Sequence, residues 1–396
     1  TIPAQNFSEE TMKSGIGFDA SNYGYAVVEK SDMVFIPDPD TAIVDPFCEI
    51  PTLSMTGNAM IIDSPANRPL AQYPRNIVRA AEQYMKDCGI ADTMLILPEF
   101  EFYLFDQVGW NVSPDNISAD VDAQQSYFNS DIAGNGVIVP KQKNYHIAKP
   151  FDVTYECRSE MCMHMADAGI EINYHHPEVA ASGQFEIEPQ LGKMSEMADN
   201  TMWIKYIIRN TALKYGKTAT FMPKPIYGEA GSGMHVHIQL FKEGEPVFSD
   251  DNGYSNLSET AHYFIGGLLK HISSLCAITN PSTNSFKRLI PGFEAPVTVG
   301  YATSNRSAVI RIPAYAKAPD KRRFELRNPD ATCNPYFCYA AILMAGLDGI
   351  KNKIDPRANG WGPYDFNLFN LPEEEKAKLQ GLPTSLEAAL DALEAD

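Results

Sequence analysis

Glu99-Phe-Glu-Phe-Tyr-Leu-Phe105 predicts a β-strand that places Glu99 and Glu101 on one face and apolar side chains on the other. The same period of two recurs in Gln184-Phe-Glu-Ile-Glu188, His235-Val-His-Ile-Gln-Leu-Phe241 and Arg323-Phe-Glu-Leu-Arg327. A single alternating strand is ordinarily just half exposed to solvent. These four polar faces, however, carry glutamate, histidine and arginine, with almost no lysine or threonine. The pattern therefore predicts strands that converge on one polar site.

Carboxylates and one or two imidazoles gathered from several strands favour a hard divalent cation. Mg²⁺ or Mn²⁺ takes oxygen ligands in near-octahedral geometry, whereas zinc more often recruits cysteine or several histidines. Arginines beside such ligands bind anions, because the guanidinium fork pairs with two oxygens of a phosphate or carboxylate. Metal ligands together with arginines indicate phosphoryl transfer.

Length and composition narrow the class of protein. The 396 residues are enough for two domains, and the net charge of −18 disfavours binding to nucleic acid or to an anionic membrane. The seven cysteines have no CxxC spacing, so we expect reduced thiols in a cytoplasmic enzyme. The first residues lack the pattern of a signal peptide, and the longest apolar run, 340–347, is too short to cross a bilayer.

The order of patterns along the chain predicts a small, mostly β domain over 1–69 and a larger domain over 70–396. A helix is expected over 74–88, where Pro74 stands near the start and Gly89 at the stop. Further helices are expected at 156–168, 194–214, 256–276, where Asn256 and Glu259 suggest a capping box, and 334–353. Long loops are expected over 108–140 and 280–311, which are rich in turn-forming residues.

Eight matching stretches, in the same order, resemble class I glutamine synthetases over nearly the whole chain. They are Gly17-Phe-Asp-Ala-Ser21, Pro98-Glu-Phe-Glu-Phe102, His175-His-Pro-Glu-Val-Ala180 with Gly183-Gln-Phe-Glu186, Lys217-Thr-Ala-Thr-Phe-Met-Pro-Lys-Pro225, Gly231-Ser-Gly-Met-His-Val-His237, Asn280-Pro-Ser-Thr-Asn-Ser-Phe-Lys-Arg-Leu-Ile-Pro-Gly-Phe-Glu294, Asn305-Arg-Ser307 and Arg323-Phe-Glu-Leu-Arg327. The resemblance implies an α+β fold with a small N-terminal β-grasp domain. It also implies a large catalytic domain with an antiparallel β-barrel, of the glutamine synthetase/guanido kinase-like kind, flanked by helices.

The resemblance also implies roles for particular residues. One Mg²⁺ or Mn²⁺ ion would be held by Glu101, Glu178 and Glu186, and a second by Glu99, His235 and Glu325. Contacts to glutamate and the transferred phosphate would come from Gly231, Arg288, Arg306 and Arg327. Contacts to ATP would come from His237, Gln239, Arg311 and Arg323.

The implied reaction is the ATP-dependent ligation of ammonia to glutamate in two steps. The γ-carboxylate of glutamate takes the γ-phosphoryl group of ATP, and ammonia then displaces phosphate from γ-glutamyl phosphate to give glutamine. Three residues are expected to be catalytic. Asp19 would bind and deprotonate ammonium, Glu294 would cover the intermediate and help to receive a proton, and Arg306 would contact the phosphate.

The family's assembly implies that the chain is a homo-oligomer with active sites between subunits, in hexameric rings stacked as a dodecamer. Asp19 would then act in the site of a neighbouring subunit. Phe369 stands where regulated bacterial members carry the tyrosine that is adenylylated, so we expect no control of that kind.

Some positions depart from the family pattern and leave the acceptor open. Ala20 and Asn22 differ near the ammonium pocket, Ala230 replaces an asparagine that contacts glutamate, and Asn173 replaces a glutamate of the nucleotide pocket. One alternative is therefore a γ-glutamyl ligase for another small amine or a polyamine. A second is a catalytically silent homologue that serves as a structural or regulatory binding module, although the retained metal ligands and Glu294 argue against it.

Overall fold

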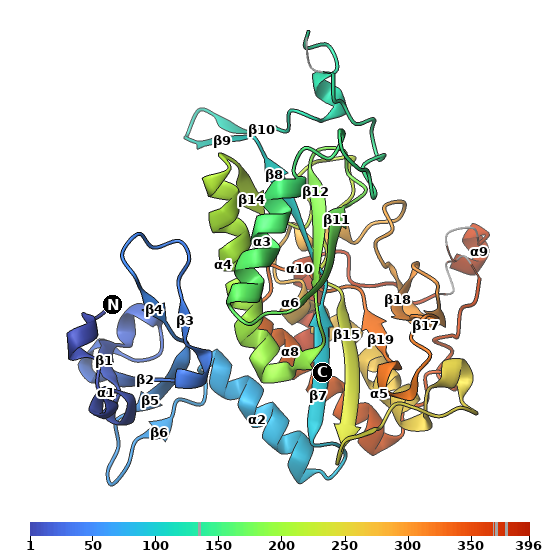
Figure 1. Ribbon diagram of the computed structural model, residues 1–396. Coiled ribbons are helices and arrows are strands. Elements are labelled where there is room, and N and C mark those ends of the chain that lie inside the picture. The colour runs from blue at the N-terminus through green and yellow to red at the C-terminus, as the bar shows by residue number, and fades with distance from the viewer. Residues whose placement is uncertain (134–135, 367, 369–370, 377–378) are drawn as a thin grey trace. The chain divides into compact units, whose positions relative to one another are not determined.

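A computed structural model describes residues 1–133, 136–366, 368, 371–376 and 379–396 (Figure 1). Contacts within the chain divide it into two compact units, Thr1–Tyr84 and Met85–Asp396. Helix α2 (Pro74–Asp87) crosses this division, so the helix expected over 74–88 is confirmed.

The first unit is built on an antiparallel sheet of four strands in the order β1-β2-β5-β6. These are β1 (Ile16–Asp19), β2 (Asp32–Pro37), β5 (Gly57–Ile61) and β6 (Arg68–Pro69). Helix α1 (Glu9–Ser14) precedes the sheet, and β3 (Ile43–Val44) pairs with β4 (Leu53–Ser54) in a separate ribbon. The unit is mostly β, as expected. Its core forms around Ala20, Met33, Ala59 and Leu70.

Two larger sheets organise the second unit. The four-stranded sheet has the order β11 (Ile172–Pro177), β12 (Gln184–Pro189), β8 (Phe100–Phe105) and β14 (Thr218–Thr220). The seven-stranded sheet has the order β13 (Gly192–Lys193), β7 (Thr93–Pro98), β15 (Val236–Lys242), β19 (Phe324–Leu326), β18 (Ala308–Ile312) and β17 (Thr298–Thr303), with β16 (Glu245–Pro246) paired to β15.

One extended stretch of chain belongs to both sheets. Strands β7 and β8 are separated only by Glu99, so the stretch leaves the seven-stranded sheet and enters the four-stranded one at this glutamate. The alternation in the sequence predicted strands with one apolar face and one polar face. Every residue of β8 and of β12 is buried, so the polar faces are covered as well. A covered carboxylate is costly unless hydrogen bonds or opposite charges compensate it.

The antiparallel barrel is not confirmed. No pairing among the described residues joins the edges of the two sheets into a closed ring, and β17 runs parallel to β18, so the larger sheet is mixed. The second unit is a mixed α/β domain.

Helices cover the sheets of the second unit. They are α3 (Tyr155–Asp167), α4 (Met194–Lys214), α5 (Glu259–Lys270), α6 (Ile272–Thr279), α7 (Ser285–Arg288), α8 (Pro335–Asn352), α9 (Glu373–Lys376) and α10 (Leu386–Ala395). Helices α3 and α4 lie side by side against the four-stranded sheet (Figure 1). Short 3₁₀ turns occur at Ala4–Asn6, Ser21–Tyr23, Val28–Lys30, Pro39–Thr41, Tyr127–Asn129, Tyr254–Asn256 and Pro319–Lys321. Within the described part of the chain, none of the helices has the length and apolar character needed to cross a bilayer.

Three expectations about local structure were wrong. The segment 108–140 contains an exposed hairpin, β9 (Gln107–Val112) and β10 (Ile117–Asp122), and 280–311 contains α7, β17 and part of β18. The helix expected over 256–276 is interrupted at His271 and begins at Glu259. Its cap is the hydroxyl of Ser258, which accepts a hydrogen bond from the backbone of Ala261. The turn-forming residues led to the prediction of loops. Strands form there nevertheless, because pairing with a partner distant in sequence can override the local preference for turns.

Helices α5 and α8 pack closely because glycines face each other at their contact. A Cβ atom built on Gly267 would lie 2.1 Å from the carbonyl oxygen of Ala345, and one on Gly349 would lie 2.1 Å from that of Tyr263. The atoms that such a Cβ would meet belong to the helix backbone, which cannot move aside as a flexible side chain can.

We predict that Gly267→Ala destabilises the second unit by about 1–3 kcal/mol or more, because the added methyl group forces the two helices apart. The unfolding midpoint in urea, followed by circular dichroism, measures the effect. Gly109→Ala is the matched control, since its added Cβ would meet nothing closer than 3.9 Å. Equal midpoints for the two variants would contradict the packing argument.

Candidate active site

The glutamates at the junction of the two sheets are fixed by backbone pairing. The amide of Glu99 donates to the carbonyl of His235 at 2.9 Å, and the amide of Glu101 donates to that of Gly233 at 3.3 Å. The amide of Gly233 in turn donates to the Glu101 carboxylate at 2.7 Å. The junction therefore holds both carboxylates against the segment that leads into β15.

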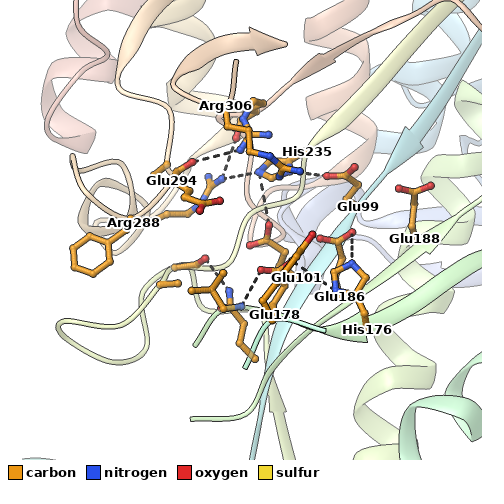
Figure 2. Close-up of a pocket in the computed structure, with 18 of the residues that line it drawn as sticks. Glu99, Glu101, His176, Glu178, Glu186, Glu188, His235, Arg288, Glu294 and Arg306 are labelled. Carbon is orange, nitrogen blue, oxygen red and sulfur yellow. Dashed lines mark hydrogen bonds and ion pairs between the residues drawn. The ribbon is translucent and has the colours of Figure 1, made fainter. Parts of the chain in front are cut away.

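Strand register brings a second set of side chains to the same cavity. Glu186 on β12 lies opposite Glu101 on β8, and His176 on β11 lies opposite Glu186. His176 Nε2 is 3.6 Å from a carboxylate oxygen of Glu186, and its Nδ1 is 3.7 Å from one of Glu178. Figure 2 shows these residues with Glu99 and Glu188 around one pocket.

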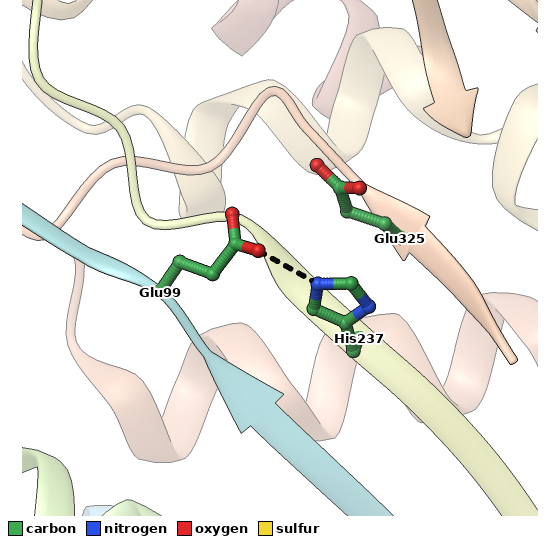
Figure 3. A group of neighbouring side chains, drawn as sticks. All are labelled: Glu99, His237 and Glu325. Carbon is green, nitrogen blue, oxygen red and sulfur yellow. Dashed lines mark hydrogen bonds and ion pairs between the residues drawn. The ribbon is translucent and has the colours of Figure 1, made fainter. Parts of the chain in front are cut away.

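A third set surrounds Glu99. His235 Nδ1 lies 2.6 Å from one oxygen of Glu99, and His237 Nε2 lies 2.9 Å from the other. Glu325 is 3.4 Å from His235 Nδ1 and lies across from Glu99 and His237 (Figure 3). Two histidines and two glutamates thus meet where β7, β15 and β19 pair.

Arginines approach these carboxylates from β18, from the two ends of β19 and from α7. The fully buried Glu325 accepts hydrogen bonds from Arg311 and, at 2.6 Å, from Arg327. Arg288 is held by the carbonyl oxygens of Arg327, Asn328 and Pro329 at 2.8–3.2 Å. Arg323 donates to His237 Nδ1 at 3.2 Å.

Burial and charge act differently on the carboxylates of the cluster. Burial, together with the neighbouring carboxylates, raises the pKa of Glu178 and that of Glu186 well above the usual range. Burial would also raise the pKa of Glu99, but hydrogen bonds from His235 and His237 hold it well below the usual range. Arg327 similarly outweighs burial and lowers the pKa of Glu325. Glu325 is therefore paired with arginines and Glu99 is hydrogen-bonded to histidines, whereas Glu178 and Glu186 have no arginine partner within ion-pair distance among the described residues.

The cavity has a volume of about 880 Å³. The predicted site residues that line it are Glu99, Glu101, Glu178, Glu186, Gly231, His235, Arg288, Glu294, Arg306, Arg311, Arg323 and Arg327. His237 and Glu325 are buried behind this wall and reach it through Glu99, His235 and the arginines. Gln239 does not line the cavity either, since its amide nitrogen donates to the carbonyls of Asp320 and Arg322.

Asp19 lies on the first unit and is exposed. Its carboxylate accepts hydrogen bonds from the amide and hydroxyl of Ser21 at 2.9 and 2.6 Å and from Asn22 at 2.7 Å. The Ser21 contacts are the main cause of its lowered pKa. Asn22, one of the departures from the family pattern, thus helps to orient Asp19.

The sequence reading assigned no role to several residues that line the cavity. They include Gln142, Tyr145, Tyr174, His176 and Glu188. Period two had already placed Glu188 on the same strand face as Glu186, and this signal could have found it. The tyrosines carry no comparable signal in the sequence, because they reach the cavity through tertiary contacts.

Three groups of side chains could each hold a cation, since one ligand atom from each member lies within 4.8 Å of the others. The groups are His176, Glu178 and Glu186; Glu99, His237 and Glu325; and Glu99, Glu186 and Glu188. The donors are carboxylate oxygens and imidazole nitrogens, without cysteine, which fits Mg²⁺ or Mn²⁺.

Comparison with known proteins agrees with this chemistry. The catalytic domain of glutamine synthetase matches residues 71–396, and the β-grasp domain of glutamine synthetase matches residues 1–61. A glutamine synthetase of Frankia alni is 46% identical over 401 residues, which cover 100% of this chain and 83% of the relative. A 3-hydroxylaminophenol mutase of Cupriavidus pinatubonensis is 44% identical with the same coverage.

A solved structure of Plasmodium falciparum glutamine synthetase is similar to the whole chain, with a TM-score of 0.85 and 29% sequence identity. The match covers 100% of this chain and 84% of the solved one. The N-terminal unit accordingly has the β-grasp fold, and the second unit has the catalytic fold. The chain belongs to the glutamine synthetase family.

Proposed function

We propose that the cavity of the second unit carries out the ATP-dependent synthesis of glutamine from glutamate and ammonia. One observation carries this proposal: in a chain of this family, a single cavity brings the glutamate–histidine cluster together with Arg288, Arg306, Arg311, Arg323 and Arg327. Ligation of a larger amine is not favoured, because relatives of 42–46% identity over the whole chain are named glutamine synthetase.

Two divalent ions would be held by the buried carboxylates. Glu101, Glu178 and Glu186 would hold one, and Glu99, His235 and Glu325 the other. The groups with close ligand atoms contain His176 in place of Glu101 and His237 in place of His235, so these two histidines are alternative ligands. The proximity of His176 to Glu178 and Glu186 supports a role in orienting these two carboxylates. When bound, the ions would neutralise charge on the phosphates of ATP and on the transferred phosphoryl group.

Arginines would position glutamate and the phosphoryl group. Arg288 would bind the α-carboxylate beside Gly231, and its three carbonyl partners already hold the guanidinium in place, so little reorganisation is needed. Arg306 and Arg327 would contact the γ-carboxylate and the phosphoryl group that it accepts. The γ-carboxylate oxygen attacks the γ-phosphorus, and ADP leaves.

ATP would be held by a second pair of arginines. Arg311 and Arg323 line the cavity, and His237 orients Arg323 through its Nδ1. Gln239 is buried away from the cavity, and its hydrogen bonds to Asp320 and Arg322 support an indirect role, in which it fixes the turn before Arg323.

Ammonia then attacks the acyl carbon of γ-glutamyl phosphate and phosphate leaves. Glu294 lies at the cavity wall in a loop and would receive a proton from the attacking nitrogen while shielding the acyl phosphate from water. Asp19 of a neighbouring subunit would bind and deprotonate ammonium, which requires a homo-oligomer such as the stacked hexameric rings. The free cysteines of the chain support a cytoplasmic setting. Phe369, the basis for expecting no adenylylation, lies outside the described residues.

We predict that phosphate release from ATP with Mg²⁺ and glutamate is stimulated by ammonium, and that methylamine, ethanolamine and polyamines give little stimulation. A coupled phosphate assay and chromatography of the amide product measure this. Greater stimulation by one of the larger amines would contradict the assignment of ammonia. Silence with every amine would contradict the enzymatic role.

We predict that Glu294→Ala lowers the rate of glutamine formation by about 10²–10⁴-fold, because a general base and part of the cover over the acyl phosphate are lost. Glu243→Ala is the matched control, since Glu243 is another exposed glutamate with a similar positive φ of 52°, against 59° for Glu294. Equal glutamine formation by the two variants would show that Glu294 has no catalytic role.

A further inference from the structure

The loop over residues 290–296 carries Glu294 and has an unusual backbone at its tip. Gly292 has φ +94° and Glu294 has φ +59°, so Phe293 lies between two residues in the left-handed region. Such a conformation persists only where surrounding contacts enforce it. One contact is a hydrogen bond of 3.4 Å from Arg327 to the carbonyl of Glu294. A second contact is made by the half-buried ring of Phe293, which packs against Lys224.

Lys224 packs its ammonium group against that ring. The Nζ atom lies 3.6 Å from the centre of the Phe293 ring, and the Lys224 residue is only 7% exposed. The other lysine–aromatic contacts found in the described parts of the chain are longer, at 4.7–5.7 Å. A cation held over a ring and shielded from water is attracted more strongly than an exposed one.

The segment that carries Lys224 is itself rigidly held. Asn284 brackets the lysine, because its side chain accepts from the Lys224 amide at 2.7 Å and donates to the Lys224 carbonyl at 3.1 Å. The Nζ atom also donates to the backbone carbonyl of Glu229. Burial lowers the pKa of Lys224 to about 8, so its ammonium group remains largely charged at neutral pH.

Lys224 thus contacts two segments of chain that line the cavity, the one at residues 229–231 and the loop over 290–296. Glu229 directly precedes Ala230 and Gly231, which line the cavity where glutamate is proposed to bind. Phe293 and Glu294 line it from the loop. The ammonium group of Lys224 therefore contacts the 229–231 segment through the carbonyl oxygen of Glu229 and the loop through the ring of Phe293.

We propose that Lys224 is a positioning residue, which holds the 290–296 loop over the cavity through Phe293 and keeps Glu294 above γ-glutamyl phosphate. The chemical consequence rests on the proposed function. The contact between Lys224 Nζ and the Phe293 ring, which we call the latch, is a property of the fold. Loss of the latch would leave the loop open for longer, so that water would compete with ammonia for the acyl phosphate.

Hydrogen–deuterium exchange of the unliganded protein tests the latch without any assay of activity. We expect the amides of Ile290 and of residues 292–295 to exchange faster in Lys224→Met and in Phe293→Leu than in the parent protein, by about three-fold or more. Lys149→Met is the control, because it removes an exposed lysine 4.7 Å from the ring of Tyr155. Unchanged exchange in both latch variants would overturn the proposal, whatever reaction the protein catalyses.

The ratio of phosphate released to glutamine formed tests the consequence. It should be about one in the parent protein and rise to about two or more in Lys224→Met and Phe293→Leu, because γ-glutamyl phosphate is hydrolysed. The double variant should be no worse than either single one, since both remove the same contact. Phe293→Tyr, which keeps the ring, should restore the ratio.

A ratio that stays near one in both single variants, or effects that add in the double variant, would overturn the positioning role. If the parent protein formed no glutamine, the proposed function would fail, and the exchange experiment would still decide the latch. Two single variants keep the test decisive if one of them does not fold.

Discussion

Repulsion between buried carboxylates is the constraint on which the second unit depends. Glu99, Glu101, Glu186, Glu188 and Glu325 are all buried around one cavity, and charges of like sign are costly in such surroundings. Protein cations offset this cost only in part. Arginines bind Glu325 and histidines bind Glu99, whereas burial and the neighbouring carboxylates raise the pKa of Glu178 and that of Glu186. The fold therefore holds a cluster that favours protons or added cations.

The junction of the two sheets brings these carboxylates together. A single stretch belongs to both sheets and changes from one to the other at Glu99, so Glu99 at the junction and Glu101 on β8 meet the carboxylates of β12 and β19. The arginines both stabilise the carboxylate cluster and line the cavity. Their bonds to Glu325 and to backbone carbonyls fix their positions, and their place on the cavity wall leaves their charge available to an anion that enters the cavity. A partly neutralised carboxylate cluster beside fixed arginines suits the phosphoryl transfer that we propose for this cavity.

Much of this could be read from the sequence, and the limits have physical causes. Period two in residues 99–105 and 184–188 predicted which glutamates share a face, because side-chain direction in a strand is a local property. The helix over 194–214 was likewise correct to the residue. The hairpin β9–β10 and the parallel pair β17–β18 were missed, since pairing depends on partners that local composition does not reveal. Tyr145 and Tyr174 reach the cavity through such long-range contacts as well. Gln239 shows the opposite case, because it follows the strand pattern yet turns its amide to the backbone.

Calorimetric titration of the protein with Mn²⁺ at pH 6, in buffers of different ionisation enthalpy, would show whether the buried carboxylates bind divalent ions. The account predicts at least two ions per chain and release of protons on binding, because carboxyl groups with raised pKa values must lose protons to become ligands. In Glu186→Gln both the number of ions and the number of protons released should fall. Binding of a single ion or of none, or binding of two without release of protons, would contradict the account.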